Sequence, residues 1–280
     1  MISAMVRSPT SHPLSFLPRN GITVVGHRGA RGCAPENTLP SLDLAVEQGA
    51  HMMEIDVQLS ADGVPMVIHD ATVDRTTNGT GAVRSMTQEE LQQLDAGCWF
   101  VNPDGSRPFT GSLIPSLKEV LTRYPDTPIT IELKAESGLA LSDAVARVIE
   151  KTNRVHNVIV ASDSLHCLNR FRRVQPEAVT SLARKEVATF YALYLAGLHR
   201  RFSSPGQLFQ IPCSYYGIPL TTGGFIRAAH ELGMHVQAWT VNEEDHIRSL
   251  IQNGVDGLVT DYPGKVLQVC EECQTRDGHR

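Results

Sequence analysis

Short apolar runs rich in β-branched residues recur along the chain, and segments whose apolar residues repeat with helical spacing separate them. Eight of these runs have the length of buried strands. They occupy residues 22–26, 51–57, 129–133, 158–161, 178–182, 208–211, 235–240 and 257–260. Strands that alternate with helices are typical of repeated βα units, so the pattern predicts an α/β fold built on a parallel sheet.

The predicted helices between these strands have recognisable start and stop signals. Segment 38–48 repeats its apolar positions with helical spacing and is followed by Gly49, a usual residue just beyond a helix. Ser116 and Glu119 have the spacing of a capping box. Another apolar repeat stops at Gly254. Eight strands with such helices predict a (β/α)8 TIM barrel.

One interval interrupts this rhythm. Residues 71–115 lie between the second strand and the helix that leads to the third strand, far beyond the ~2–6 residues usual for such loops. Thr87 and Glu90 form a second capping-box pattern inside it, so part of the segment is predicted to be helical. We therefore expect a small cap inserted after the second strand, beside the candidate site.

Length and charge limit the alternatives. The 280 residues, 41% of them hydrophobic, suffice for one barrel domain at 21–268, between an N-terminal tail (1–20) and a C-terminal tail (269–280). The net charge of −5 and the scattered Lys and Arg residues argue against nucleic-acid binding. No run reaches the ~18 apolar residues of a membrane span, and the first twenty residues lack a signal-peptide core.

Six cysteines are spread along the sequence, which favours a reducing compartment over a disulfide framework. We therefore expect a cytoplasmic protein. Cys270 and Cys273 form a CxxC pair, but further ligands at zinc-site spacing are missing from the sequence around them. We interpret both as spare thiols.

Polar residues gather where the predicted strands end, which is where barrel enzymes carry their catalytic groups. They are His27, Arg28, Glu54, Asp56, His69, Asp70, Glu132, Lys134, Trp239 and Asn242. Glu54 and Asp56 lie two residues apart and share one face of a strand. Together with Glu132 they make an oxygen-rich cluster suited to one divalent cation, Mg²⁺ or Ca²⁺. The competing interpretation is a structural ion network with Arg28 and Lys134.

Two histidines at strand ends suit proton transfer. An imidazole with a pKa near ~6.5 can take up or release a proton at neutral pH. His27 and His69 each stand next to charged residues, unlike the other nine histidines, which we interpret as surface or packing residues. They are our candidates for general acid and base.

Five segments resemble the glycerophosphodiester phosphodiesterase family in sequence and in order. They are HRGARGCAPENT (27–38), EIDVQLSADGVPMVIHDATVDRTTNGTG (54–81), IELK (131–134), WTVN (239–242) and GVDGLVTDYP (254–263). The resemblance covers roughly residues 21–265. Segment 210–217 matches the sixth-strand region of the family only loosely. Cys33 stands in the loop before the PENT motif without an apparent function.

The resemblance implies a barrel with an inserted cap and assigns roles that agree with the cluster above. It places the metal on Glu54, Asp56 and Glu132, catalysis on His27 and His69, and the phosphate on Arg28 and Lys134. Glu36 is expected near the metal or its waters, whereas Asn37 and Thr38 also suit a helix start. Trp239 is expected to contact the substrate.

The expected reaction is hydrolysis of glycerophosphodiesters, such as glycerophosphocholine or glycerophosphoethanolamine, to sn-glycerol 3-phosphate and an alcohol. A related alternative is lysophospholipase D, for which Trp99, Phe100 and Phe109 would line an acyl groove or form the core of the cap. A third is a phosphate-binding barrel without catalysis. The leaving alcohol, the choice between Mg²⁺ and Ca²⁺, and a possible homodimer stay open.

Overall fold

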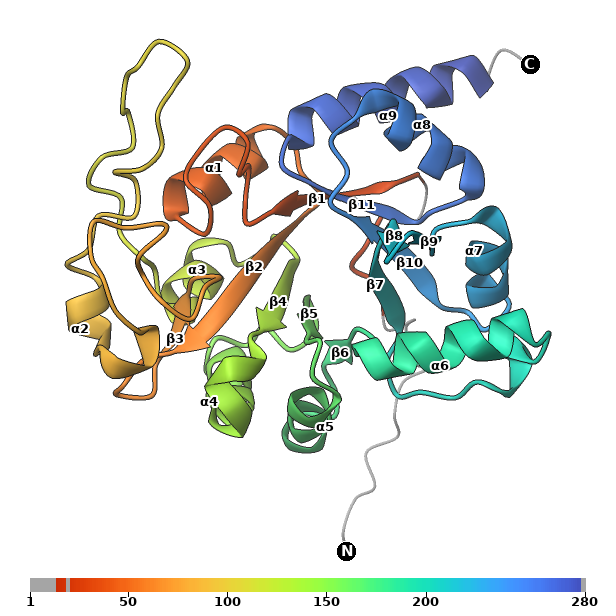
Figure 1. The fold of residues 1–280 in the computed structure, drawn as a ribbon, viewed down its shortest axis with the longest axis horizontal. Helices are drawn as coiled ribbons and strands as arrows, with labels where there is room; N and C mark the ends of the chain where they lie inside the picture. Colours follow the sequence, from red (N-terminus) through yellow and green to blue (C-terminus); the bar gives the residue numbers. More distant parts are fainter. Residues whose placement is uncertain (1–13, 19–20, 278–280) are drawn as a thin grey trace, which may run out of the picture.

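Eight parallel strands form the centre of the computed structural model, which describes residues 14–18 and 21–277. They are β1 (Thr23–His27), β2 (Met52–Leu59), β4 (Ile129–Leu133), β5 (Val158–Ala161), β6 (Val179–Thr180), β7 (Leu208–Pro212), β10 (His235–Trp239) and β11 (Gly257–Thr260). Their order is β6-β5-β4-β2-β1-β11-β10-β7, and a parallel bridge from Ser181 to Leu208 joins the two ends. The predicted TIM barrel is thus confirmed as a nearly closed eight-strand barrel (Figure 1).

Helices surround the barrel and follow the strands along the chain (Figure 1). They are α1 (Leu39–Glu47), α3 (Leu117–Arg123), α4 (Gly138–Lys151), α5 (Leu165–Val174), α6 (Arg184–Leu195), α7 (Gly223–His230), α8 (Glu244–Asn253) and α9 (Pro263–Asp277). The predicted caps are present: Ser116 and Glu119 form the capping box of α3, and Gly254 ends α8 in the left-handed conformation. Helix α9 runs beyond residue 268, where we expected the barrel to end.

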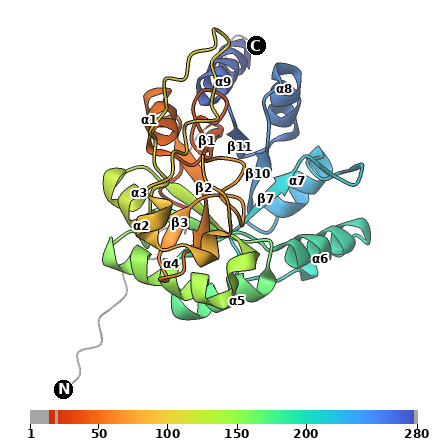
Figure 2. The same cartoon turned by 60° about the vertical axis from the view of Figure 1, so that its left-hand side comes forward.

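The inserted segment builds a small cap with its own apolar core. Strand β3 (Pro65–Val67), just before residues 71–115, pairs antiparallel with β2, and the short helices η1 (Val83–Ser85) and α2 (Gln88–Leu91) follow within them. Figure 2 shows α2 and β3 beside β2 and α3. The buried residues of this core are Met66, Ile68, Val73, Val83, Leu91, Ala96 and Ile114. The cap therefore packs as a unit against the β2 side of the barrel.

A segment before β1 contributes to the interior of the barrel. Leu14 and Leu17 are buried among strand residues that include Met52 and Leu208, the first residues of β2 and β7. These two leucines fill the N-terminal end of the barrel, opposite the strand ends that carry the polar residues. Residues within the stretch that we assigned to a tail thus pack into the core.

Candidate active site

Strand pairing places the candidate residues at one level of the barrel. His27 pairs in register with Glu54 across β1 and β2, and Asp56 pairs with Glu132 across β2 and β4. A cavity of about 400 Å³ opens above them. Seven of the sequence candidates line it, namely His27, Arg28, Glu54, His69, Glu132, Lys134 and Trp239.

The loop after β1 turns sharply so that Arg28 points back into the site. Arg28 has a positive φ of 52°, and Gly29 follows with φ 85°. A Cβ on Gly29 would lie 2.5 Å from Ser41, so only glycine fits this close approach. The Arg28 carbonyl accepts hydrogen bonds from the Asn37 backbone N–H and from the Ser41 hydroxyl, which fixes the turn.

The three carboxylates Glu54, Asp56 and Glu132 converge as predicted. One oxygen from each lies within 4.8 Å of the others, an arrangement that could hold a metal ion. Asp56 is compensated by cations, because Lys134 Nζ lies 2.7 Å and Arg28 Nε 3.0 Å from its oxygens. Burial alone would raise the pKa of Asp56, but these two charges lower it to about 2.

Glu54 has a different environment within the same cluster. Its side chain accepts a hydrogen bond from the Arg28 backbone amide at 3.1 Å and has no ion-pair partner among the described residues. Burial raises the pKa of Glu54 well above its usual range, and the charges of Asp56 and Glu132 add to this effect. An ion network with Arg28 and Lys134 therefore pairs directly with Asp56 but leaves Glu54 without an ion pair, and the nearby charges of Arg28 and Lys134 only partly offset the rise in the pKa of Glu54. A divalent cation held by all three oxygens would remove this imbalance.

A carboxylate fixes one ring nitrogen of His27. Its Nδ1 lies 2.7 Å from Asp261 Oδ1, and Asn242 donates to the other oxygen of Asp261 at 2.9 Å. Since Nδ1 is engaged, Nε2 is the ring nitrogen free for a ligand in the cavity. Asp261 directly follows the last barrel strand, so the strand-end rule could have identified it.

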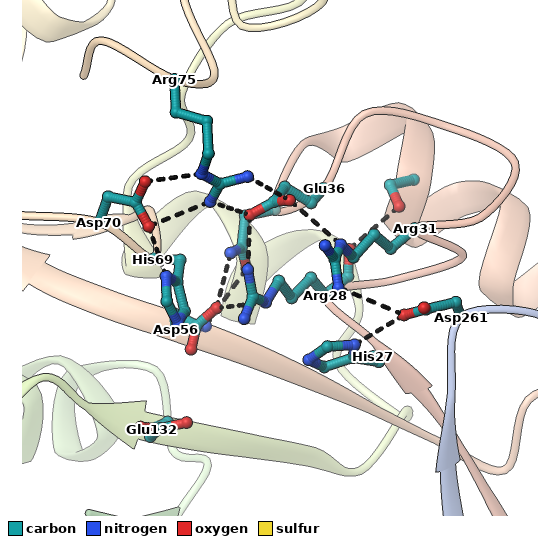
Figure 3. A network of polar contacts seen from close by, with 12 residues as sticks. His27, Arg28, Arg31, Glu36, Asp56, His69, Asp70, Arg75, Glu132 and Asp261 are labelled. Atoms are coloured by element: carbon teal, nitrogen blue, oxygen red, sulfur yellow. Dashed lines mark hydrogen bonds and ion pairs between the residues drawn. The ribbon is translucent and has the colours of Figure 1, made fainter. Parts of the chain in front are cut away.

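His69 is held in the same way by the cap. Its Nδ1 lies 2.5 Å from Asp70 Oδ1, and Arg75 donates to Asp70 at 2.7 Å (Figure 3). Burial lowers the pKa of His69, which favours its neutral form. Both histidines therefore present Nε2 to the cavity and Nδ1 to a carboxylate.

Glu36 connects the cap to the barrel through arginines. Arg75 donates to both of its oxygens at 2.8 and 2.9 Å, Arg28 donates at 2.7 Å and Arg31 at 3.1 Å (Figure 3). Burial alone would raise the pKa of Glu36, but Arg75 and Arg28 lower it to about 2. Glu36 lies outside the group of carboxylates that could hold a metal.

Asn37 also has a role that the sequence left open. Thr38 caps α1, whereas the Asn37 amide donates to Asp56 Oδ2 at 2.9 Å and accepts from the Asp56 backbone at 3.2 Å. Asn37 therefore orients a carboxylate of the acid cluster rather than starting the helix. Its positive φ of 58° suits asparagine, which tolerates this conformation better than most residues.

The site combines acidic groups able to hold a cation with Arg28, Lys134 and two histidines that are each bound to a carboxylate. This combination is typical of barrel enzymes that hydrolyse phosphate esters. The family comparison gives this class a name. Residues 27–265 match the glycerophosphoryl diester phosphodiesterase family. The chain belongs to this family, and it is a glycerophosphodiester phosphodiesterase, a hydrolase.

Known proteins from several bacteria agree. The Bacillus subtilis (strain 168) protein YhdW, provisionally named a glycerophosphodiester phosphodiesterase, is 36% identical over 88% of this chain and 96% of its own length. A glycerophosphodiester phosphodiesterase of Caldanaerobacter subterraneus is 31% identical, with the same coverage of both chains. A phosphodiesterase of Oleispira antarctica, solved in complex with the product sn-glycerol-3-phosphate, superposes with a TM-score of 0.74. It is 29% identical and covers 92% of this chain and 99% of its own.

Within the described residues, every helix is too short or too polar to pass through a lipid bilayer. Two further features of the candidate site were not predicted. One is the arginine pair Arg31 and Arg75 around Glu36, which depends on contacts between distant loops. The other is Asp163, which lines the cavity and is the second residue after β5. It obeys the strand-end rule and could have been found by it.

Proposed function

We propose that the enzyme hydrolyses glycerophosphodiesters such as glycerophosphocholine and glycerophosphoethanolamine to sn-glycerol 3-phosphate and an alcohol. The observation that carries this proposal is that the acid cluster, the side chains of Arg28 and Lys134 and both histidines meet at one cavity. The product bound to the Oleispira antarctica relative supports the glycerol phosphate half of the substrate.

We propose that Glu54, Asp56 and Glu132 hold one divalent cation. Their all-oxygen donor set fits Mg²⁺ and Ca²⁺ equally, and the pKa of Glu54 stays well above its usual range despite the nearby charges of Arg28 and Lys134. When bound, such a cation supplies Lewis-acid polarisation of the phosphoryl oxygens. Arg28 and Lys134 lie beside the same carboxylates, where they offset negative charge on the phosphate.

We assign proton transfer to the two histidines. His27 Nε2 takes the proton from the glycerol 2-hydroxyl or from a water, and that oxygen bonds to phosphorus as the bond from phosphorus to the alcohol oxygen breaks. His69 Nε2 gives its proton to the departing alcohol oxygen. Where the 2-hydroxyl attacks, a water then opens the cyclic phosphate to glycerol 3-phosphate. The two assignments are interchangeable on the geometry, because each ring is held at Nδ1 by a carboxylate. Trp239, exposed at the cavity mouth, contacts the substrate.

The test is release of glycerol 3-phosphate from glycerophosphocholine by metal-stripped protein, with Mg²⁺ and Ca²⁺ restored separately. Glu54→Ala should abolish the response to metal, and His27→Ala and His69→Ala should each lower turnover by about 10²-fold. His230→Ala is the matched control, because His230 also pairs with a carboxylate, Asp256 at 2.8 Å, but lies outside the cavity. A loss below tenfold in either variant would remove that histidine from catalysis.

Lysophospholipase D is the alternative that an acyl groove would favour. The cap aromatics instead pack edge-to-face, with ring centroids 5.8 Å apart for Trp99 and Phe100 and 5.3 Å for Phe100 and Phe109. All three lie outside the residues that line the cavity, which argues against an acyl groove, and they form a half-buried aromatic group apart from the buried core of the cap. Turnover of lysophosphatidylcholine above that of glycerophosphocholine would reverse this preference. Binding of glycerophosphocholine without turnover under either ion would instead indicate the non-catalytic barrel.

We also propose a reducing, cytoplasmic location. All six cysteines are free, including Cys270 and Cys273, which lie one helical turn apart on α9. Modification of all six thiols in freshly purified protein, without reductant, would agree with this location, and a disulfide would argue against it.

A further inference from the structure

The loop between β1 and α1 rests directly on the segment that follows β11. The Gly32 backbone N–H donates to the Asp261 carbonyl at 2.9 Å. A Cβ on Gly32 would lie 2.2 Å from the ring of Tyr262, so this contact is as close as glycine permits. The contact brings Arg31, the residue before Gly32, beside the Asp261 side chain. Arg31 lines the cavity with a side chain that is 35% exposed.

Arg31 connects two carboxylates that belong to different parts of the site. Its Nε donates to Glu36 Oε2 at 3.1 Å, and its Nη1 lies 3.8 Å from Asp261 Oδ1 (Figure 3). Glu36 is the carboxylate that binds Arg75 of the cap, whereas Asp261 holds His27. Within residues 14–18 and 21–277, Arg31 is the single Lys or Arg side chain that forms an ion pair with Asp261.

The Asp261 carboxylate has a partner on each of its exposed sides. Oδ1 lies 2.7 Å from His27 Nδ1 and also faces Arg31, while Oδ2 accepts from Asn242 at 2.9 Å. Burial would raise the pKa of Asp261, but His27, Asn242 and Arg31 together lower it. The carboxylate is therefore kept ionised and has little freedom to turn away from the ring of His27.

We infer that Arg31 is a positioning residue, which holds the Asp261 carboxylate against His27 and acts on the reaction through this contact. Through Glu36 the same guanidinium also connects the His27 pair to the ion pairs that support His69. Both histidines are thus supported by one continuous series of charged contacts. This inference rests on the proposed function, because it assumes that His27 transfers a proton.

Arg31→Met removes the charge and keeps the length of the side chain. Glu36 still accepts from Arg28 and Arg75, so the anchor of the cap is retained. The kcat for glycerophosphocholine should fall about three- to tenfold, more than exposed ion pairs usually give, because Asp261 is only 17% exposed. KM should stay within about twofold of wild type, because a positioning residue does not bind the substrate.

Two further variants show whether the ion pair with Asp261 causes this loss. Arg31→Lys should recover part of kcat, because the ammonium group restores the charge but cannot reach both carboxylates in the same way. The matched control is Arg170→Met. Arg170 also pairs with a carboxylate, Asp143 at 2.7 Å, and is 40% exposed, but it lies on the outer helices α4 and α5. Its kcat and KM should equal those of the wild type.

A double-mutant cycle with Asp261→Asn gives the decisive measurement. If Arg31 acts through Asp261, adding Arg31→Met to Asp261→Asn should lower kcat by less than about twofold more. Losses that multiply, an unchanged kcat in Arg31→Met, a rise in KM as large as the fall in kcat, or an equal loss in Arg170→Met would overturn the inference and leave the phosphodiesterase function intact. Wild-type protein that cleaves no glycerophosphocholine under either ion would instead overturn the proposed function, and this role of Arg31 with it.

Discussion

Replacing Glu36 by Gln removes one negative charge from the centre of the arginine network and keeps the shape of the side chain. The Glu36 side chain is 2% exposed and accepts hydrogen bonds from three arginines. In Glu36→Gln one carboxylate oxygen becomes an amide NH₂, which is a donor and faces other donors. The variant should therefore fold less stably and hold Arg28 and Arg75 less firmly.

The expected loss of folding stability follows from the pKa of Glu36. It falls from an ordinary 4.5 to about 2 in the folded protein, so the charge contributes about 3 kcal/mol at neutral pH, at about 1.4 kcal/mol per pKa unit. Because the folded-state pKa is depressed, this stabilisation is complete above about pH 4.5 and disappears as the pH falls towards 2. Loss of a partner from other buried ion pairs costs a similar amount, about 3–5 kcal/mol.

Urea unfolding of wild type and Glu36→Gln at pH 7, 5, 4 and 3 measures this difference directly. The free energy of unfolding should differ by about 3 kcal/mol at pH 7, and the difference should shrink between pH 5 and 3. Glu231→Gln is the control, because Glu231 also pairs with an arginine and a histidine but lies at the surface. A difference below about 1 kcal/mol at pH 7, or one that does not change with pH, would refute this reasoning.

Three further substitutions test other parts of the structure. Arg154→Ala should destabilise the protein by about 3 kcal/mol or more in urea unfolding, because the buried guanidinium donates to three backbone carbonyls, one in the last turns of α3 and two in the loop before β4. Leu17→Ala should cost about 2–4 kcal/mol in the same assay, since it opens a cavity at the N-terminal end of the barrel. Asp261→Asn should lower kcat by about 10²-fold or more with little change in the melting temperature, because His27 loses the carboxylate that fixes its tautomer. A change below 1 kcal/mol, or below tenfold in kcat, would contradict the respective assignment.

The barrel could be predicted because its signals are local. Each strand is a short apolar run, and the helix starts and stops depend on residues within one turn, as at Ser116, Glu119 and Gly254. The acid cluster could also be predicted from the sequence. Two of its members share a strand face, and the third ends the neighbouring strand, so the period of a β-strand places them together.

Other parts of the site depend on contacts that the sequence does not encode locally. Arg75 meets Glu36 across 39 positions of chain, and Asp261 meets His27 across 234. Asn37 belongs to a helix start by residue type, but a positive φ turns its amide towards Asp56. Propensity places such residues in loops correctly, yet only the closed barrel determines which loops meet.

The distribution of charge ties the cap to the chemistry of the barrel. The acid cluster needs positive charge, and Arg28 supplies part of it while also binding Glu36. Glu36 in turn binds Arg75 of the cap, which holds Asp70 against His69. Ion pairs thus connect the acid cluster, through Arg28, Glu36, Arg75 and Asp70, to the ring of His69. A shift of the cap would therefore change both the charge around Arg28 and the orientation of His69, which makes the inserted segment part of the active site rather than a cover over it.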